Sequence, residues 1–169
     1  MRIIGLAGWS GAGKTTLLAK VIPRLTGRGL TVSTLKHAHH AFDIDQPGKD
    51  SHTHRMAGAT EVLIGSANRW ALMHELRGSA EPALGELLGK LTPVDLVIVE
   101  GYKWEHHPKL EVHRVANGKP LLQPDDSFIV AIAADPIVPA AVPVVALDDG
   151  EAVVEIMLKH AAPVGSPRA

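Results

Sequence analysis

The strongest constraint on the fold is a glycine-rich segment, residues 8–15, which lies between an apolar run and a helical pattern. It reads Gly-Trp-Ser-Gly-Ala-Gly-Lys-Thr and fits the phosphate-binding pattern G-x-x-x-x-G-K-[ST]. Residues 3–7 before it predict a strand, and residues 16–22 after it predict a helix. The three glycines permit backbone conformations that a Cβ would penalise, so successive N–H groups can surround phosphate oxygens at a helix N-terminus.

The chemistry of this loop assigns a role to each of its side chains. Lys14 is expected to reach the β- and γ-phosphates, the Thr15 hydroxyl to ligate Mg²⁺, and Thr16 to donate a further hydrogen bond to phosphate. The alternative is a glycine-rich turn that binds nothing, but the flanking strand and helix favour nucleotide binding. The predicted nucleotide-binding residues of the loop are Gly8, Ser10, Gly11, Ala12, Gly13, Lys14, Thr15 and Thr16.

Composition limits the class of protein. A chain of 169 residues predicts a single nucleotide-binding domain over residues 1–160, with residues 161–169 as a disordered tail. Hydrophobic residues make up 46% but only six are aromatic, which suits a buried parallel sheet of Val, Ile, Leu and Ala. A net charge of −1 argues against a nucleic-acid or membrane surface. With no cysteine, no membrane-length apolar run and no signal pattern, we expect a cytoplasmic location.

Strand-like and helical patterns alternate along the chain, which predicts an α/β fold with a mainly parallel sheet. Together with the phosphate loop, this indicates a three-layer P-loop NTPase fold. Residues 110–113 alternate polar with apolar and predict an edge strand or hairpin arm. The other predicted strands are residues 30–35, 61–64, 70–73, 95–100, 128–133 and 142–147, and the other predicted helices are 50–57, 81–91 and 149–160.

A second acid is predicted beside the phosphate loop. Residues 96–99 form a buried strand that ends in Glu100, and parallel strands present their carboxyl ends at one edge of a sheet. Glu100 would hold Mg²⁺ directly or through water, or position the attacking water, and would thus share the catalytic role with Lys14. The alternative is that Glu100 only marks the point at which the strand meets solvent.

The segment from residue 36 to residue 55 is unusually polar, and its long loop indicates a switch or binding loop. Asp45, or alternatively Asp43, would complete the magnesium shell, while Lys49 and Arg55 would bind a second phosphate-bearing group. The alternative is a solvated loop with incidental charges. The chain has ten histidines, several of them here, and imidazole suits zinc or nickel, yet no spacing matches a standard zinc signature.

Residues 101–109, which follow Glu100, combine cations with rings. Lys103 and Lys109, together with Tyr102 and Trp104, would form a wall for a phosphorylated heterocycle through ring stacking and charge pairing. An exposed loop with two aromatic anchors is the alternative. The neighbouring histidines, 106 and 107, fit an anionic ligand better than a metal ion.

The base of the nucleotide is predicted from one acid. The guanine-reading tetrad Asn-Lys-x-Asp is absent, but residues 129–134 form a buried strand that ends in Asp135. Its carboxylate would accept hydrogen bonds from N1–H and the 2-amino group of guanine, whereas adenine offers no matching donor pair. GTP is therefore favoured over ATP, the alternative being that Asp135 starts a turn with Pro136.

Taken together, these blocks resemble the molybdopterin-guanine dinucleotide biosynthesis protein B family. The resemblance covers residues 1–147 and rests on the phosphate loop, residues 35–40, residues 45–59 with Pro-Gly-Lys-Asp-Ser, residues 99–114 from Glu-Gly-Tyr-Lys to His-Arg, and residues 131–135. It implies a homodimeric, GTP-binding accessory protein with weak GTPase activity that supports the guanylyltransferase joining GMP to molybdopterin. The clusters Lys49/Arg55 and Lys103/Lys109 would then suit the phosphate of molybdopterin or the partner protein.

Two other functions stay open at this stage. A P-loop small-molecule kinase would use the same loop, with Asp45 as general base, although no arginine-rich lid is evident. A metallochaperone GTPase would carry nickel or zinc on the histidines. For the GTPase, the sequence places no arginine finger in cis, which predicts slow hydrolysis unless a partner or second subunit supplies that group.

Overall fold

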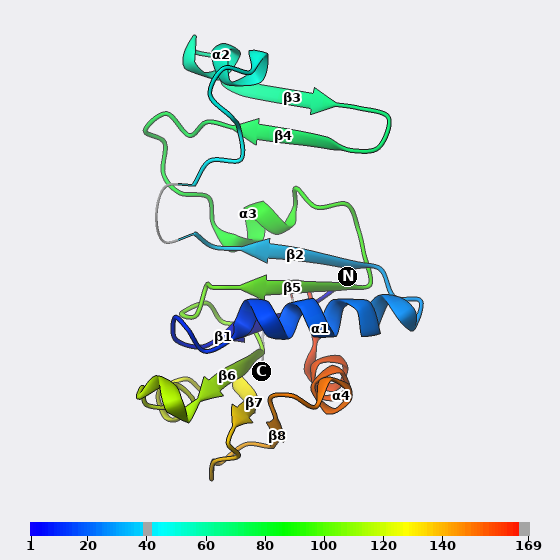
Figure 1. The fold of residues 1–169 in the computed structure, drawn as a ribbon, viewed down its shortest axis with the longest axis vertical. Coiled ribbons are helices and arrows are strands. Elements are labelled where there is room, and N and C mark those ends of the chain that lie inside the picture. The colour runs from blue at the N-terminus through cyan, green and yellow to red at the C-terminus, as the bar shows by residue number, and fades with distance from the viewer. Residues whose placement is uncertain (39–41, 166–169) are drawn as a thin grey trace. The chain divides into compact units, whose positions relative to one another are not determined.

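The computed structural model describes residues 1–38 and 42–165, and the chain divides into two compact units. The first comprises Met1–His37 and Leu84–Ala169, and the second comprises Ala38–Ala83. Each unit has a sheet of its own, drawn in Figure 1. None of the described helices is long and apolar enough to cross a membrane.

A parallel sheet forms the centre of the first unit. Its strand order is β2-β5-β1-β6-β7-β8, and the short strand β9 pairs antiparallel with β1. Because the six strands in that order run parallel, their carboxyl ends meet at one edge. The strands are β1 (Arg2–Ala7), β2 (Val32–Lys36), β5 (Leu96–Glu100), β6 (Lys109–Arg114), β7 (Ile129–Asp135), β8 (Val144–Ala146) and β9 (Ala162–Pro163).

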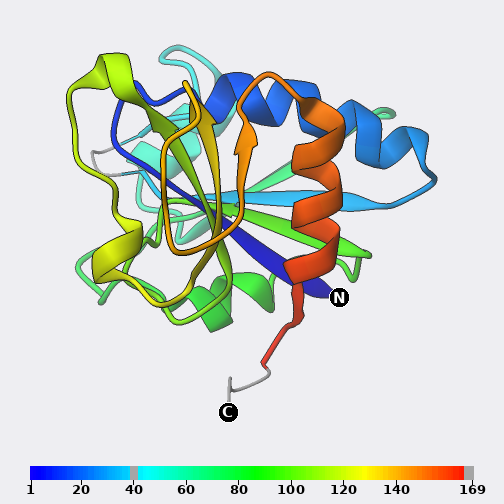
Figure 2. The same cartoon turned by 90° about the horizontal axis from the view of Figure 1, so that it is seen from below.

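Helices cover both faces of this sheet, which gives three layers. Helices α1 (Lys14–Gly27) and α4 (Gly150–His160) pack side by side on one face, as Figure 2 shows. Helix α3 (Leu84–Leu88) packs on the other face against Val97 and Val99 of β5. The predicted α/β class with a mainly parallel sheet is therefore confirmed.

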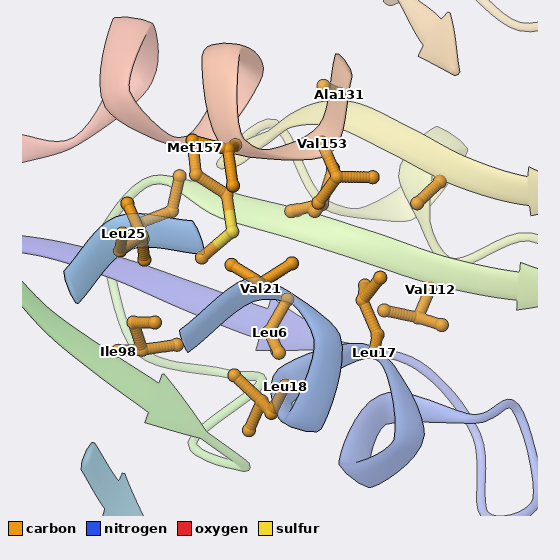
Figure 3. Packing of buried hydrophobic residues seen from close by; sticks show 14 of the residues in the cluster. Leu6, Leu17, Leu18, Val21, Leu25, Ile98, Val112, Ala131, Val153 and Met157 are labelled. Carbon is orange, nitrogen blue, oxygen red and sulfur yellow. The ribbon is translucent and has the colours of Figure 1, made fainter. Parts of the chain in front are cut away.

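The main core lies between the sheet and the two helices on its first face. Helix α1 presents Leu17, Leu18, Val21 and Leu25 on one stripe, the spacing expected when a single helix face is buried. Figure 3 shows these side chains meeting Val153 and Met157 of α4 above Leu6 and Ile98 of the sheet. Complete burial of each such side chain contributes about 1.5–3 kcal/mol, so this stripe holds the helix that follows the phosphate loop firmly in place.

Strand β6 is central, which corrects the prediction of an edge strand or hairpin arm at residues 110–113. It lies between β1 and β7, and Lys109, Glu111 and His113 are all buried. The alternation of polar with apolar residues is misleading because the side chains of Lys109 and Glu111 have internal partners. Glu111 accepts hydrogen bonds from the amides of Leu122 and Gln123 at 2.8 and 2.9 Å, and its burial raises the pKa of the carboxyl.

A β-hairpin forms a separate two-stranded sheet in the second unit. Strands β3 (Glu61–Gly65) and β4 (Trp70–His74) pair antiparallel, and helix α2 (Asp50–Met56) precedes them. The predicted elements at residues 50–57, 61–64 and 70–73 are thus present. One face of the ribbon carries Leu63, Trp70 and Leu72, which are 66%, 68% and 47% exposed.

The end of the first unit departs from the expected disordered tail. Residues 162 and 163 form β9, and the amide of Val164 donates to the carbonyl of Met1. The guanidinium of Arg2 also binds the carbonyl of Ala161, so the described part of this segment is ordered. Residues 166–169 lie outside the described residues. Helix α4 begins as predicted, with Asp149 capping the amide of Ala152 at 3.0 Å, whereas α3 is shorter than the predicted residues 81–91.

Candidate functional site

The glycines of the phosphate loop adopt backbone conformations that other residues rarely take. Gly8, Gly11 and Gly13 have φ angles of 138°, 79° and 99°, and Gly13 is the N-cap of α1. A Cβ on Gly8 would also run into the backbone carbonyl of Val112. The first-turn N–H groups of α1, a 14-residue helix with one buried face, therefore lie at this loop, an arrangement that favours phosphate.

Lys14 bends back over its own loop. Its ammonium donates hydrogen bonds to the carbonyls of Gly8 and Trp9, at 2.8 and 3.0 Å. Burial lowers the pKa of Lys14; Glu100 opposes this shift, while the positive charges of Lys36 and Lys103 add to it. Lys14 is therefore surrounded by two further lysines and one carboxylate, a predominantly positive environment.

A segment that the sequence analysis did not assign to the site braces this loop from the side. Asn117, in the 3-10 helix Val115–Asn117, donates from its side-chain amide to the carbonyl of Ser10 at 2.8 Å. The Trp9 indole donates to the carbonyl of Pro120 at 2.8 Å, and the Lys103 ammonium lies 4.9 Å from the centre of that ring. The sequence does indicate that residues 115–120 follow a strand of the parallel sheet. Because that strand was expected at an edge, this segment was not expected to lie beside the phosphate loop.

Glu100 lies where the second acid was expected. In the strand register it is level with Leu6 of β1 on one side and Lys36 of β2 on the other. Its side chain is 13% exposed, and one carboxylate oxygen lies 3.8 Å from the ammonium of Lys36. The expectation that Glu100 lies at the same edge of the sheet as the phosphate loop is confirmed, and Lys36 ends its strand at that edge as well.

The turn after Glu100 is held in a constrained conformation. Gly101 has a φ of 93°, and a Cβ there would meet the side chain of His37. Tyr102 has a φ of 46°, which is unusual for a residue other than glycine, and its ring centre lies 4.6 Å from that of His37. These contacts constrain the path of the chain as it leaves β5.

Few protein ligands for a metal ion come together in the part of the chain that the structure describes. No group of three or more His, Asp and Glu side chains in this part could hold a metal, and His39 and His40 lie outside it. The Thr15 hydroxyl and the Glu100 carboxylate fit Mg²⁺, which keeps several waters and takes most of its other ligands from nucleotide phosphates. The residues present thus suit magnesium brought in with a nucleotide.

A cavity of about 100 Å³ lies beside the phosphate loop and contains the predicted base reader. Asp135, at the end of β7, accepts a hydrogen bond from Arg114 at 2.6 Å, and both side chains line the cavity. Arg114 was not predicted, although it ends a strand of this sheet as Glu100 does. The remaining lining residues are Gly13, Thr16, Leu17, Lys20, Leu147 and Asp148.

The structure removes Lys109 from the predicted anion-binding cluster. Lys109 is 1% exposed, and its ammonium is engaged by Asp126 at 2.7 Å and by the carbonyls of Lys103 and Glu105. His107 is also buried, and this burial lowers its pKa to about 4, so the ring is neutral near pH 7. Both residues are structural, whereas Lys103 remains at the surface with its ammonium 5.0 Å from the ring centre of Trp104.

The predicted residues of the polar loop belong to the second unit. Arg55 pairs with Asp43 at 2.5 Å and Glu75 at 3.2 Å, and its Nε lies 3.6 Å from the carboxylate of Asp45. Asp45 also accepts hydrogen bonds from the Ser51 hydroxyl and the Gln46 amide. This internal network accounts for the charges of both Asp45 and Arg55. Lys49 is exposed and is the N-cap of α2.

Comparison with known proteins agrees with the resemblance drawn from the motifs. The chain is 41% identical over 149 residues to the molybdopterin-guanine dinucleotide biosynthesis adapter protein of Escherichia coli (strain K12), covering 86% of this chain and 84% of that protein. It is also 41% identical over 134 residues to the adapter protein of the same name from Haemophilus influenzae, covering 78% and 73%.

Solved structures show the same fold. A crystal structure of a MobB protein homolog from Bacillus stearothermophilus superposes with a TM-score of 0.67 at 25% identity, over 93% of this chain and 95% of that one. The Bacillus subtilis MobB crystal structure gives a TM-score of 0.72 at 20% identity, over 96% and 99%. Residues 3–135 match the family described as molybdopterin guanine dinucleotide synthesis protein B, or MobB. This chain therefore belongs to the MobB family.

Proposed function

We propose that this adapter protein of molybdopterin-guanine dinucleotide biosynthesis binds GTP with Mg²⁺, hydrolyses it slowly, and supports the guanylyltransferase that joins GMP to molybdopterin. One observation carries the proposal of nucleotide binding. The glycines of the loop have positive φ angles, the Lys14 ammonium folds back over the loop, and Glu100 ends the adjacent strand, a combination that supports phosphate binding.

The geometry supports a defined set of roles. The loop amides and the N-terminus of α1 would bind the phosphates, and the Lys14 ammonium would exchange two loop carbonyls for phosphate oxygens. Bound Mg²⁺ would neutralise charge on the β- and γ-phosphates. Thr15 and Glu100 would hold the ion, and the Glu100 carboxylate would also orient a water molecule. No arginine is assigned to the γ-phosphate, which is consistent with slow hydrolysis.

The base preference is proposed to come from Asp135. Its carboxylate lines the cavity beside Gly13 and Thr16, on the side of the loop away from Glu100 in the strand order. Arg114 donates to one oxygen of this carboxylate and would hold it in position. One oxygen would keep the arginine while the other accepts from the base.

The Asp135→Ala substitution tests this assignment. We expect the affinity for GTP to fall at least about tenfold, because hydrogen bonds to a charged acceptor are lost, while the affinity for ATP stays unchanged. Titration calorimetry with both nucleotides measures the two constants, and Asp125→Ala, which removes an exposed carboxylate of the 3-10 helix Gln123–Asp125, is the matched control. An unchanged ratio of GTP to ATP affinity would exclude Asp135 as the base reader.

Homodimerisation and binding of molybdopterin complete the proposal. The ribbon of β3 and β4 leaves Leu63, Trp70 and Leu72 exposed on one face, and an isolated two-stranded hairpin is only marginally stable in water. A second copy would cover this apolar face. Lys49 and Lys103 support binding of an anionic partner because each lies at the surface of its own unit.

The oligomeric state is directly measurable. Sedimentation of the purified chain is expected to give twice the monomer mass of 17.9 kDa. Substitution of Trp70 by glutamate, which places charge on the apolar face, should shift the protein to monomer. A wild-type chain that sediments as a monomer at micromolar concentration would contradict this part of the proposal.

A further inference from the structure

We propose that Lys36 is a second lysine of the phosphate site, and that it binds the terminal phosphate of a nucleoside triphosphate. The inference rests on the proposed nucleotide binding and adds a residue that distinguishes a triphosphate from a diphosphate. Lys36 lies outside the phosphate-binding pattern of residues 8–15 and ends a different strand.

The sheet fixes the position of Lys36 relative to the phosphate loop. Lys36 is level with Glu100, which in turn is level with Leu6 of β1, two residues before the loop begins. The backbones of Lys36 and Leu6 are therefore separated by two strand spacings, about 10 Å, across the carboxyl edge. From this position the Lys36 ammonium comes within 3.8 Å of the Glu100 carboxylate, and the charges of both residues act on Lys14 of the loop.

The charges at this edge are not balanced within the protein. The positive charges of Lys36 and Lys103 both act on Lys14, and Glu100 is the carboxylate that opposes them there. Three lysines against one carboxylate leave a local charge of +2. This excess suits a ligand with several negative charges, such as a triphosphate.

The two flanking lysines are held differently. The Lys103 ammonium lies between two indoles, 4.9 Å from the ring centre of Trp9 and 5.0 Å from that of Trp104. The Lys36 side chain is 64% exposed, and its ammonium lies 3.8 Å from Glu100, longer than a hydrogen bond. Because the lysine of this pair is exposed and the separation is long, the pair contributes little, so Lys36 can turn from Glu100 to a phosphate at small cost.

This exchange links the terminal phosphate to the acid of the site. When Lys36 moves to the γ-phosphate, the Glu100 carboxylate loses one of its positive neighbours, and the oxygen that faced Lys36 becomes available as an acceptor. A diphosphate has no γ-phosphate for Lys36 to bind, so the Lys36–Glu100 pair would persist. Lys36 thus distinguishes the two nucleotide states by charge, and the nucleoside carries no part of this distinction.

Affinities of the full chain for a non-hydrolysable GTP analogue and for GDP, both with Mg²⁺, test the inference. Lys36→Met should weaken binding of the analogue at least about tenfold while GDP affinity changes less than about twofold. Lys36→Arg should restore most of the loss because it keeps the charge. Lys159→Met, which removes an exposed lysine in the last turn of α4, is the matched control and should change neither affinity.

The outcomes separate this inference from the proposed function. Equal losses for the analogue and GDP, or no loss for either, would overturn the role of Lys36 while nucleotide binding stands. If the wild-type chain prefers adenine nucleotides, the same comparison with an ATP analogue and ADP applies. A wild-type chain that binds no nucleotide would overturn the proposed function and this inference together.

Discussion

Replacing Lys14 with alanine is expected to abolish the thermal stabilisation of the protein by GTP and Mg²⁺. The ammonium is the cation placed inside the phosphate loop, and hydrogen bonds from charged groups contribute about 1.5–3 kcal/mol each. With bonds to both the β- and γ-phosphates lost, the affinity should fall about a hundredfold or more. Differential scanning fluorimetry at a fixed GTP concentration measures the lost shift.

The unliganded Lys14→Ala protein must be measured alongside. Lys14 also bonds the carbonyls of Gly8 and Trp9, so the variant should melt somewhat below the wild type without nucleotide. Lys159→Ala is the matched control, and its shift with GTP should equal that of the wild type. A Lys14→Ala protein that still shows the full shift would mean that the stabilising ligand binds elsewhere.

Replacing Asp126 with asparagine is expected to destabilise the fold by about 3–5 kcal/mol. Asp126 pairs at 2.7 Å with Lys109, which is 1% exposed, and removing one partner of a buried pair leaves an uncompensated charge. Asparagine retains the oxygen that accepts from the amide of Phe128. The loss of unfolding free energy therefore reports the effect of the charge alone, and urea unfolding measures this loss.

A double substitution supplies the control for this prediction. Lys109→Met with Asp126→Asn removes both charges and keeps an apolar chain of similar length in the strand, so the double variant should be more stable than Asp126→Asn alone. The carbonyls of Lys103 and Glu105 lose their donor, which keeps the double variant below the wild type. A single variant within about 1 kcal/mol of wild type would show that the pair is not a determinant of stability.

The sequence predicted those parts of the fold in which the local pattern of polar and apolar residues matches their burial. The phosphate loop, the apolar stripe of α1 and the strand ending in Glu100 each carry a signal within a few residues. Strand β6 was misplaced because its polar residues look solvent-facing, and their partners Asp126 and the amides of residues 122 and 123 are distant in sequence. Pairing of β9 with β1 is likewise a long-range contact that no local pattern predicts.

The candidate site was predicted in outline for the same reason. Glycine conformations follow from the motif, and the parallel topology brings Glu100 and Lys36 to the edge where the loop lies. The sequence does not reveal with which residues a charged side chain pairs in the folded protein. Lys109 and Arg55 were expected to bind anions, but each pairs with carboxylates inside its own unit. Arg114 and Asn117 were not assigned to the site, because their contacts with Asp135 and Ser10 are seen only in the three-dimensional structure.

The central claim is that this MobB-family chain binds GTP at the loop of residues 8–15. The most direct measurement is the melting temperature of the wild-type protein with GTP or ATP, each with and without Mg²⁺. At a hundredfold excess over Kd, binding adds about 2.7 kcal/mol to stability, which gives a readily measured shift. A Mg²⁺-dependent shift with GTP that is absent with ATP is the expected result. A shift with ATP alone, or none with either nucleotide, would contradict the account.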